Sequence, residues 1–429
     1  MRNFRAILGV AVMLLSVSAD AQLTLDECQQ MASDNYPLLQ KYDLVRQTTE
    51  YTIKNIQRGY WPQLSLGGQV SYQSEVTDLP DVLSHLLSES SPNYKGMAKD
   101  QYQIALDLNQ VIWDGGHIKA RRDLAASDAE VQVAQADVEM YAIRSRVNEL
   151  FFGILLLDEK IRLNETLQTL LLDNCRMLET RKMHGTAMES DVDVMRAEYL
   201  EARQDLTALR SMRKSYRQML AIFIGKDTAS VINLQKPAAS LPQTFDNRRP
   251  ELNLYAMQMQ QTEAQSHLLN VGLRPKLSLF AQGVYGYPGY DMFDSMFDHD
   301  LKLNGIVGIR FSWNIGRLYT FKTDKHKLEL TRKQIETARE IFLFNNNLQS
   351  VREREAVNQY HQMMEEDSDI IRLRTSVRQA AEAKLQHGVI GVNDLLQEIT
   401  KENRARIDHS LHEMEMLKNI YELKHTINQ

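Results

Sequence analysis

Two histidine pairs are the first residues in this sequence whose types and spacing could do chemistry. His409 and His412 lie three positions apart, and His361 precedes Glu365 by four. On a helix either spacing places both side chains on one face, where they could ligate a metal ion. Neither pair belongs to an H-E-x-x-H motif, and charged residues surround both. Solvated helix faces are therefore the favoured interpretation.

Other catalytic patterns are missing from the sequence. It contains no G-x-S-x-G motif, no nucleotide-binding loop and no Cys–His set. The acidic run Asp298, His299 and Asp300 falls in an expected external loop, where a surface role is favoured over a catalytic one. We therefore predict that the protein is not an enzyme and that it uses no metal or other cofactor.

The chain begins with a predicted export signal, residues 1–21. Arg2 and Arg5 form a charged start, residues 6–17 are apolar, and residues 19–21 read A-D-A, which fits the A-x-A pattern of a cleavage site. No later segment has the roughly 18 apolar residues that a transmembrane helix needs. The mature protein is thus either soluble outside the cytoplasm or crosses a membrane as strands.

Composition narrows the class further. The chain has 429 residues, of which 43% are hydrophobic and 25% are charged, as in folded proteins. The net charge of −6 and the lack of a basic run argue against nucleic-acid binding. Only two cysteines occur, which excludes a disulfide scaffold. Cys28 lies outside any lipidation motif, so no lipid anchor is expected, and Cys175 is expected to be a small buried hydrophobe.

The elements that must position any functional residue are dominated by a long helix over residues 118–183. No proline interrupts it, and its apolar residues repeat every three or four positions, which predicts a coiled-coil seam. At 1.5 Å per residue such a helix reaches about 100 Å. The seam consists of Ala129, Val133, Ala136, Met140, Ile143, Val147, Leu150, Ile154, Leu157 and Ile161.

An internal duplication is the most informative feature of the sequence. Six residues of one expected strand recur 213 positions later, in a second copy of the same pattern. The recurring residues are Pro62, Leu64, Ser65, Leu66, Gln69 and Tyr72, with Pro275, Leu277, Ser278, Leu279, Gln282 and Tyr285 as their counterparts. Each copy then continues through a polar loop, a second strand, a long helix, a Gly-centred turn and a returning helix.

The duplication predicts two repeats, residues 22–224 and 251–429, joined by residues 225–250. The first repeat contains a helix over residues 23–58, which Thr24 and Glu27 open as a capping box. The predicted strands are 62–76 and 101–113 in the first repeat and 275–287 and 305–315 in the second. The intervening loops are 78–100 and 291–300, and the turns between the long helices are 183–191 and 386–394.

The strands alternate between apolar and polar residues. Leu64, Leu66 and Val70 face one way, whereas Ser65 and Gln69 face the other. This alternation is typical of a transmembrane barrel, although a half-buried soluble sheet has the same pattern. The three tryptophans favour the barrel because each lies where a strand meets a helix, as in an aromatic belt at a membrane interface. They are Trp61, Trp113 and Trp313.

Four strands are too few to close a barrel, because single-chain barrels begin at about eight. An open sheet edge is not tolerated in lipid. We therefore expect the chain to oligomerise, with each copy supplying part of one barrel and the long helices forming a second tube in the periplasm.

At this point the sequence resembles the outer-membrane efflux proteins, the TolC-like family, over nearly all of the mature chain. The order, spacing and duplication of several short stretches carry the resemblance. These are Leu23-Thr24-Leu25-Asp26-Glu27-Cys28, Trp61-Pro62-Gln63-Leu64, Val111-Ile112-Trp113-Asp114-Gly115-Gly116, Arg249-Pro250-Glu251-Leu252 and the two Gly turns with Asp191 and Asp394.

The resemblance implies a fold and a function. It implies an α+β membrane protein: a homotrimer with a 12-stranded transmembrane β-barrel in the outer membrane and an α-barrel of long antiparallel helices in the periplasm. It implies the exit duct of a tripartite efflux pump, which passes small molecules such as drugs. The implied partners are a periplasmic adaptor, an inner-membrane transporter reached through it, and outer-membrane lipid.

The resemblance also suggests site residues at the periplasmic tip. A ring of acids matches Asp394, with Asp191 in the other turn, while Gln397 stands where some members have a second acid. Leu385 and Ile390 stand where polar residues latch the closed tip in other members. An apolar latch is therefore our hypothesis, and serine at both positions should raise conductance. The expected adaptor contacts are Gly185, Thr186, Ala187, Gly388, Val389 and Ile390.

Alternative functions remain open at this point. An outer-membrane component of a type I protein secretion or metal efflux system would share the same fold. A periplasmic coiled-coil scaffold or adaptor would also have long helical hairpins and strands. The duplication argues against the scaffold, because adaptors usually carry one helical hairpin in a single nested chain.

Overall fold

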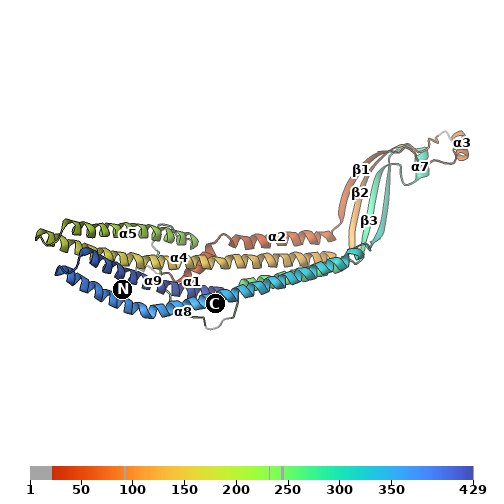
Figure 1. Cartoon of the computed structure of the whole chain (residues 1–429). Coiled ribbons are helices and arrows are strands. Elements are labelled where there is room, and N and C mark those ends of the chain that lie inside the picture. Colours follow the sequence, from red (N-terminus) through yellow and green to blue (C-terminus); the bar gives the residue numbers. More distant parts are fainter. Residues whose placement is uncertain (1–21, 91–92, 231, 243–245, 429) are drawn as a thin grey trace, which may run out of the picture. The chain divides into compact units, whose positions relative to one another are not determined.

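Figure 1 shows the computed structural model of the chain, which describes residues 22–90, 93–230, 232–242 and 246–428. The predicted signal peptide, residues 1–21, lies outside these residues. Within them, no helix combines the length and the apolar character needed to cross a membrane.

The described residues form α-helices, one short 3-10 helix (η1) and four strands in the order that the duplication predicts. In chain order they are α1 Leu25–Asn35, α2 Leu39–Gln57, η1 Arg58–Tyr60, β1 Gln63–Tyr72, α3 Asp81–Ser90, β2 Asp100–Trp113, α4 His117–Met183, α5 Glu189–Phe223, α6 Pro250–Val271, β3 Lys276–Tyr287, α7 Met292–Phe297, β4 Lys302–Ser312, α8 Arg317–Gln386 and α9 Val392–Ile427.

The chain divides into two compact units, each built from segments of both predicted repeats. One, the helical unit, comprises the described residues of Met1–Leu39, Val138–Arg249 and Phe342–Gln429. The other, the sheet unit, comprises Gln40–Asp137 and Pro250–Ile341 apart from its undescribed residues. Folding therefore brings segments of both predicted repeats together in each unit.

The first helix breaks where the sequence analysis expected it to continue. Helix α1 ends at Asn35, and α2 begins at Leu39. Tyr36 between them is extended, with φ −71° and ψ 133°, because the ring of the following residue, Pro37, disfavours the helical region for its predecessor. The prediction of one helix over residues 23–58 was therefore wrong at Pro37.

The predicted capping box at the start of α1 is confirmed. The Glu27 backbone N–H donates to Thr24 Oγ1 at 3.2 Å, and the Thr24 backbone N–H donates to Glu27 Oε2 at 2.9 Å. These bonds hold the pKa of the Glu27 carboxyl below its usual value. The two side chains thus satisfy backbone donors that a helix start otherwise leaves free.

The long helices match their predictions closely. Helix α4 has 67 residues and α8 has 70, so each spans about 100 Å. The α4 seam is buried at Ala136, Ile143, Val147, Leu150, Ile154, Leu157 and Ile161. Val133 departs from the seam at 37% exposure, because it lines an open groove between α2, α4 and α6 in the sheet unit.

The four strands form one antiparallel sheet in the order β1-β2-β3-β4 (Figure 1). Their ends lie within a few residues of the predicted bounds, although β1 stops at Tyr72 rather than residue 76 and β4 runs Lys302–Ser312 rather than 305–315. The register places Leu66 opposite Leu106 and Ser65 opposite Asp107, so the predicted alternation becomes two distinct faces.

The apolar face of the sheet is uncovered. Leu66 is 73% exposed, Val70 is 78% exposed and Val307 is 70% exposed. A soluble sheet with this alternation would bury such residues against another layer. The sheet also has two open edges, because β1 and β4 each pair with a neighbouring strand on one side only.

The predicted polar loops contain short helices that the sequence analysis did not anticipate. Helix α3 lies between β1 and β2, and α7 lies between β3 and β4, at the end of the sheet away from the long helices (Figure 1). Asp291 starts α7 by accepting a hydrogen bond from the Asp294 N–H at 3.0 Å. Apolar contacts among Met97, Tyr287 and Met296 hold this end together, which polarity alone did not predict.

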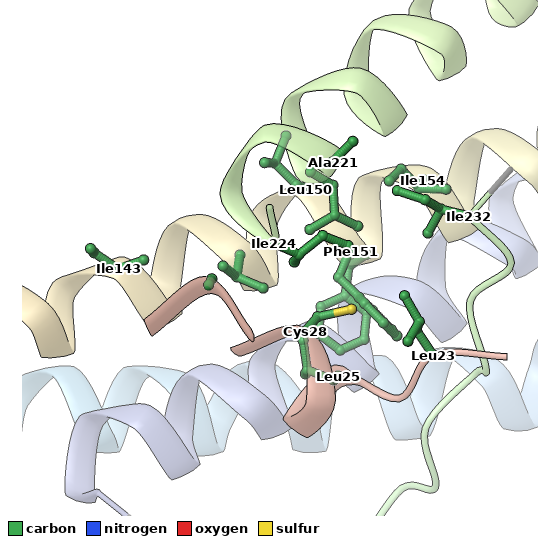
Figure 2. Packing of buried hydrophobic residues seen from close by; sticks show 14 of the residues in the cluster. Leu23, Leu25, Cys28, Ile143, Leu150, Phe151, Ile154, Ala221, Ile224 and Ile232 are labelled. Carbon is green, nitrogen blue, oxygen red and sulfur yellow. The ribbon is translucent and has the colours of Figure 1, made fainter. Parts of the chain in front are cut away.

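The main core of the helical unit gathers α1, α4, α5 and the segment after α5. Figure 2 shows Cys28 and Leu25 pointing toward Phe151, with Ile224 beside them. Burial raises the pKa of the Cys28 thiol to about 11, so it stays protonated at neutral pH. Cys175 is also buried, in a second core near the end of α4, as its seam position predicted.

Candidate periplasmic tip and channel wall

The two Gly turns share one backbone geometry. Gly185 has φ +71° and Gly388 has φ +70°, a left-handed conformation that glycine adopts without strain. The Thr186 N–H donates to the Arg181 carbonyl at 2.9 Å, and the Val389 N–H donates to the Lys384 carbonyl at 2.9 Å. Each long helix therefore ends in the same Schellman motif, and each turn presents its small loop to solvent.

The two acidic candidates of the gate occupy matching positions, as the third residue of each returning helix. Asp394 Oδ2 accepts a hydrogen bond from the Gly391 N–H at 3.0 Å, and Asp191 Oδ2 accepts one from the Met188 N–H at 3.0 Å. Both carboxylates thus cap α9 and α5. Asp394 and Gln397 are exposed, whereas Asp191 is half-buried.

A buried apolar cluster joins the two hairpins behind these turns. It combines residues of α4, α5, α8 and α9, with Leu178, Met195 and Leu395 at most 1% exposed. Leu385 belongs to this cluster at 4% exposure, and Ile390 packs against it half-buried. Within this chain, therefore, Leu385 contacts the other hairpin, and an apolar latch at this position would act through that packing.

One hydrogen bond ties the two hairpin ends directly. Arg181, in the last turn of α4, donates from Nη1 to the carbonyl of Leu385, in the last turn of α8, at 2.6 Å. A guanidinium donor makes this bond stronger than one between neutral groups. Nothing in the sequence pairs Arg181 with Leu385, which lie 204 positions apart, so the sequence analysis missed this contact.

A buried ion-pair network joins α8 and α9 two to four turns from the tip. Arg378 donates to Glu402 and to Glu382, and Arg406 Nη2 donates to Glu402 Oε1 at 2.7 Å. Burial favours the neutral form of Glu402, but hydrogen bonds from Arg406, Thr375 and Arg378 outweigh it and lower the pKa of this carboxyl. The i,i+4 spacings of Arg378–Glu382 and Glu402–Arg406 were the only signals of this network in the sequence.

The three tryptophans lie at one end of the sheet, as predicted. Trp61 precedes β1, Trp113 ends β2 and Trp313 follows β4. Their exposures are 62%, 49% and 50%, and Trp313 Nε1 donates to the Leu273 carbonyl at 2.9 Å. Exposed rings with one polar contact suit an interfacial position, where one part of the ring is apolar and the other is hydrated.

The polar face of the sheet is lined mainly by amide side chains. Gln103 Nε2 donates to Gln69 Oε1 at 3.1 Å, and Gln282 Nε2 donates to Asp107 Oδ1 at 2.7 Å. Arg310 stacks on Phe280 at 4.6 Å on the same face. These cross-strand pairs explain why the polar residues alternate as they do.

The first histidine pair contacts a carboxylate. His409 Nδ1 and His412 Nδ1 lie 3.2 Å and 2.9 Å from Oδ2 of Asp367, a residue of α8 that is 6% exposed. The second pair, His361 and Glu365, is an exposed ion pair at 3.6 Å. Among the residues that the structure describes, no group of three or more His, Cys, Asp or Glu is arranged to hold a metal ion.

Replacing Asp367 with Asn should destabilise the α8–α9 hairpin by about 1–3 kcal/mol, because two partly buried imidazoles lose their charged acceptor. Hydrogen exchange of backbone amides near residues 360–370 and 405–415 would measure the effect. Asp369→Asn is the matched control, since its carboxylate on the same helix is 71% exposed. Equal exchange in the two variants would contradict a stabilising role for Asp367.

Comparison with known proteins places this fold. Residues 29–226 match the family model for outer membrane efflux proteins. A search of curated proteins found no match to the sequence. Solved structures match over 94% of this chain, and several of them are outer-membrane channels.

Three of these structures illustrate the similarity. The outer-membrane channel OprN is 12% identical with a TM-score of 0.69, and 89% of its chain is covered. The outer membrane protein VceC of Vibrio cholerae is 13% identical with a TM-score of 0.67, and 95% is covered. The MtrE outer membrane channel of Neisseria gonorrhoeae, solved in its open state, is 14% identical with a TM-score of 0.65, and 88% is covered.

The long helices and the four-stranded sheet of this chain are the fold of solved outer-membrane channels. This class of protein is a channel class, not an enzyme class. Residues 29–226 carry the sequence pattern of the outer membrane efflux protein family, and the chain has a TolC-like fold.

Proposed function

We propose that the protein is the exit duct of a tripartite efflux pump, which passes small molecules such as drugs from the periplasm to the exterior. The observation that carries the proposal is the uncovered four-stranded sheet, with its exposed apolar face and its two open edges. Since lipid tolerates no open edge, three copies pairing β4 with the next β1 would close one barrel of twelve strands.

The faces of the sheet support a duct. The apolar face suits lipid, and the amide-lined face suits a water-filled lumen. Trp61, Trp113 and Trp313 would then lie together at one membrane interface.

The two hairpin tips would form the periplasmic entrance. We propose that the exposed carboxylate of Asp394 contributes a ring of acids to the closed tip, with Asp191, Gln397, Leu385 and Ile390 supporting it. Asp394 also caps α9, so its backbone hydrogen bond would hold the carboxylate in place. Cargo would meet this ring before it enters the amide-lined barrel.

We propose that the adaptor docks on the two turns. Gly185, Thr186 and Gly388 are exposed, and Val389 is 69% exposed, so these positions offer contact area. Ala187 and Ile390 pack partly against the tip core and would support the turns from within.

A photoreactive residue at Thr186 or Val389 in intact cells should capture a periplasmic adaptor and, through it, an inner-membrane transporter. The same residue at Tyr319, 87% exposed in the first turn of α8, is the control and should capture neither. Capture at Val389 alone would restrict the contact to the second tip. A detergent-soluble trimer that captures nothing at either tip would contradict the pump, although it would leave the channel.

A further inference from the structure

Two carboxyl groups in the helical unit, outside the tip cluster, lack ordinary partners. Glu353 lies on α8 at 4% exposure, and Glu422 lies on α9 with its side chain partly buried. Thr426, one turn after Glu422, donates from Oγ1 to Glu353 Oε1 at 3.0 Å. This bond joins α8 to α9 one helical turn from Glu422.

The hydrogen-bond partners around this pair are incomplete. Glu353 Oε1 accepts from Gln349 Nε2 at 2.6 Å and from Thr426, whereas Glu353 Oε2 is buried without a partner. Glu422 Oε2 is 3.5 Å from Ser145 Oγ, and Glu422 Oε1 is likewise buried and unpartnered. An ionised carboxylate can only accept hydrogen bonds, so neither of these two buried oxygens can satisfy the other while both groups are ionised. A single proton on either one turns it into a donor.

The charged groups around the pair do not neutralise it. For Glu353, burial raises the pKa, while the hydrogen bonds from Gln349 and Thr426 and the charges of Arg249 and Arg352 oppose the rise. The net pKa of Glu353 is raised.

Glu422 is surrounded by both like and opposite charges. Burial raises the pKa of Glu422, and the charges of Glu353 and of Glu149 on α4 raise it further. The Asn148 amide and the Lys418 charge oppose this rise without cancelling it. The charge of Glu353 therefore raises the proton affinity of Glu422, which couples the protonation of the two acids.

We propose that Glu353 and Glu422 form a proton-binding site that links α8 and α9 and makes the stability of the periplasmic helices depend on pH. The ligand is a proton shared between the two carboxyls. The site is independent of the pump function and of the gate at the tips.

The direction of the effect follows from linkage. Both carboxyls bind a proton more tightly in the folded protein than their ordinary pKa of 4.5 allows in the unfolded chain. The stabilisation is therefore fully present below pH 4.5 and is lost as the pH rises through the raised folded pKa. In that window, the opening equilibrium constant of this region should rise up to tenfold per pH unit for one proton bound.

Infrared spectroscopy of the full-length protein in detergent tests the proton directly. The wild type should show the carbonyl stretch of a protonated carboxyl above pH 4.5, and the band should disappear as the pH rises. Glu353→Gln and Glu422→Gln should each weaken this band, because a neutral amide of the same shape replaces one of the two acids that can hold the proton. Glu355→Gln, at an exposed position on α8, should leave the band unchanged.

Hydrogen exchange of amides near residues 345–360 and 415–427 tests the linkage. After correction for the intrinsic exchange rate, opening in the wild type should increase with pH, and opening in each Gln variant should depend less steeply on pH. Wild-type pH dependence in Glu353→Gln and Glu422→Gln would overturn the proposal. Protection that responds to Ca²⁺ or EDTA at constant pH would also overturn it, because the pair would then bind a metal cation instead of a proton.

Discussion

Replacement of Gly286 by valine should prevent the sheet from assembling. A Cβ atom at Gly286 would lie 2.2 Å from the Tyr102 carbonyl oxygen and 2.6 Å from Gln103 Cα, both of them backbone atoms of the paired strand β2. Backbone atoms in the middle of a sheet cannot move aside without breaking the β2–β3 hydrogen bonds. Overpacking of this kind costs about 1–3 kcal/mol or more, and the valine methyls add to it.

The expected result is loss of the proposed trimer, measured as loss of heat-modifiable migration on a gel and of detergent-extractable protein. Gly283→Val is the matched control on the same strand, because a Cβ atom there meets nothing within 4 Å. Gly283 lies in register with Leu106, on the exposed apolar face, where valine favours the strand. Equal amounts of trimer from the two variants would show that the close approach of β2 to Gly286 does not limit assembly of the sheet.

Replacement of Arg181 by methionine should loosen the closed tip. The variant removes the 2.6 Å hydrogen bond from Arg181 Nη1 to the Leu385 carbonyl, while the methionine keeps much of the apolar stem. Loss of a hydrogen bond to a charged group costs about 1.5–3 kcal/mol. Since each 1.4 kcal/mol corresponds to a factor of about ten, the opening equilibrium of the tip should shift by roughly tenfold to a hundredfold.

Single-channel recording in planar bilayers should therefore show more frequent or larger openings, and cells should take up large antibiotics faster. Arg176→Met is the control, because Arg176 lies on the same helix, is 69% exposed and pairs only weakly with Asp173. Raised conductance in the Arg176 variant would indicate a general effect of lost charge. If the Arg181 variant has wild-type conductance, this hydrogen bond does not contribute to the gate.

The hypothesis of an apolar latch needs a different test in view of the structure. Leu385 is buried among residues of both hairpins, so Leu385→Ser combines loss of a latch with a cavity in the tip core. Such a core substitution costs about 2–5 kcal/mol by itself. Ile390 is half-buried at the turn, and Ile390→Ser alone therefore separates the two effects more cleanly.

Several features followed from the sequence because they depend on neighbours along the chain. The capping box of Thr24 and Glu27 needs only residues three positions apart, and the Gly185 and Gly388 turns need only a left-handed residue after a helix. The uninterrupted α4 and the strands followed from periods of 3.5 and 2 residues. The break at Pro37 was also a local signal, and it was missed.

The tertiary structure alone decided which distant residues meet. The bond of Arg181 to Leu385, the sharing of Asp367 by His409 and His412, and the contact between Glu353 and Thr426 join residues 42 to 204 positions apart. Burial also shifts the pKa of residue types that are usually exposed, as it does by raising the pKa of Glu353. Periodicity tells which face of a helix is apolar, but not which polar residue a second helix places opposite it, because that depends on the rotation and axial offset of the packed pair.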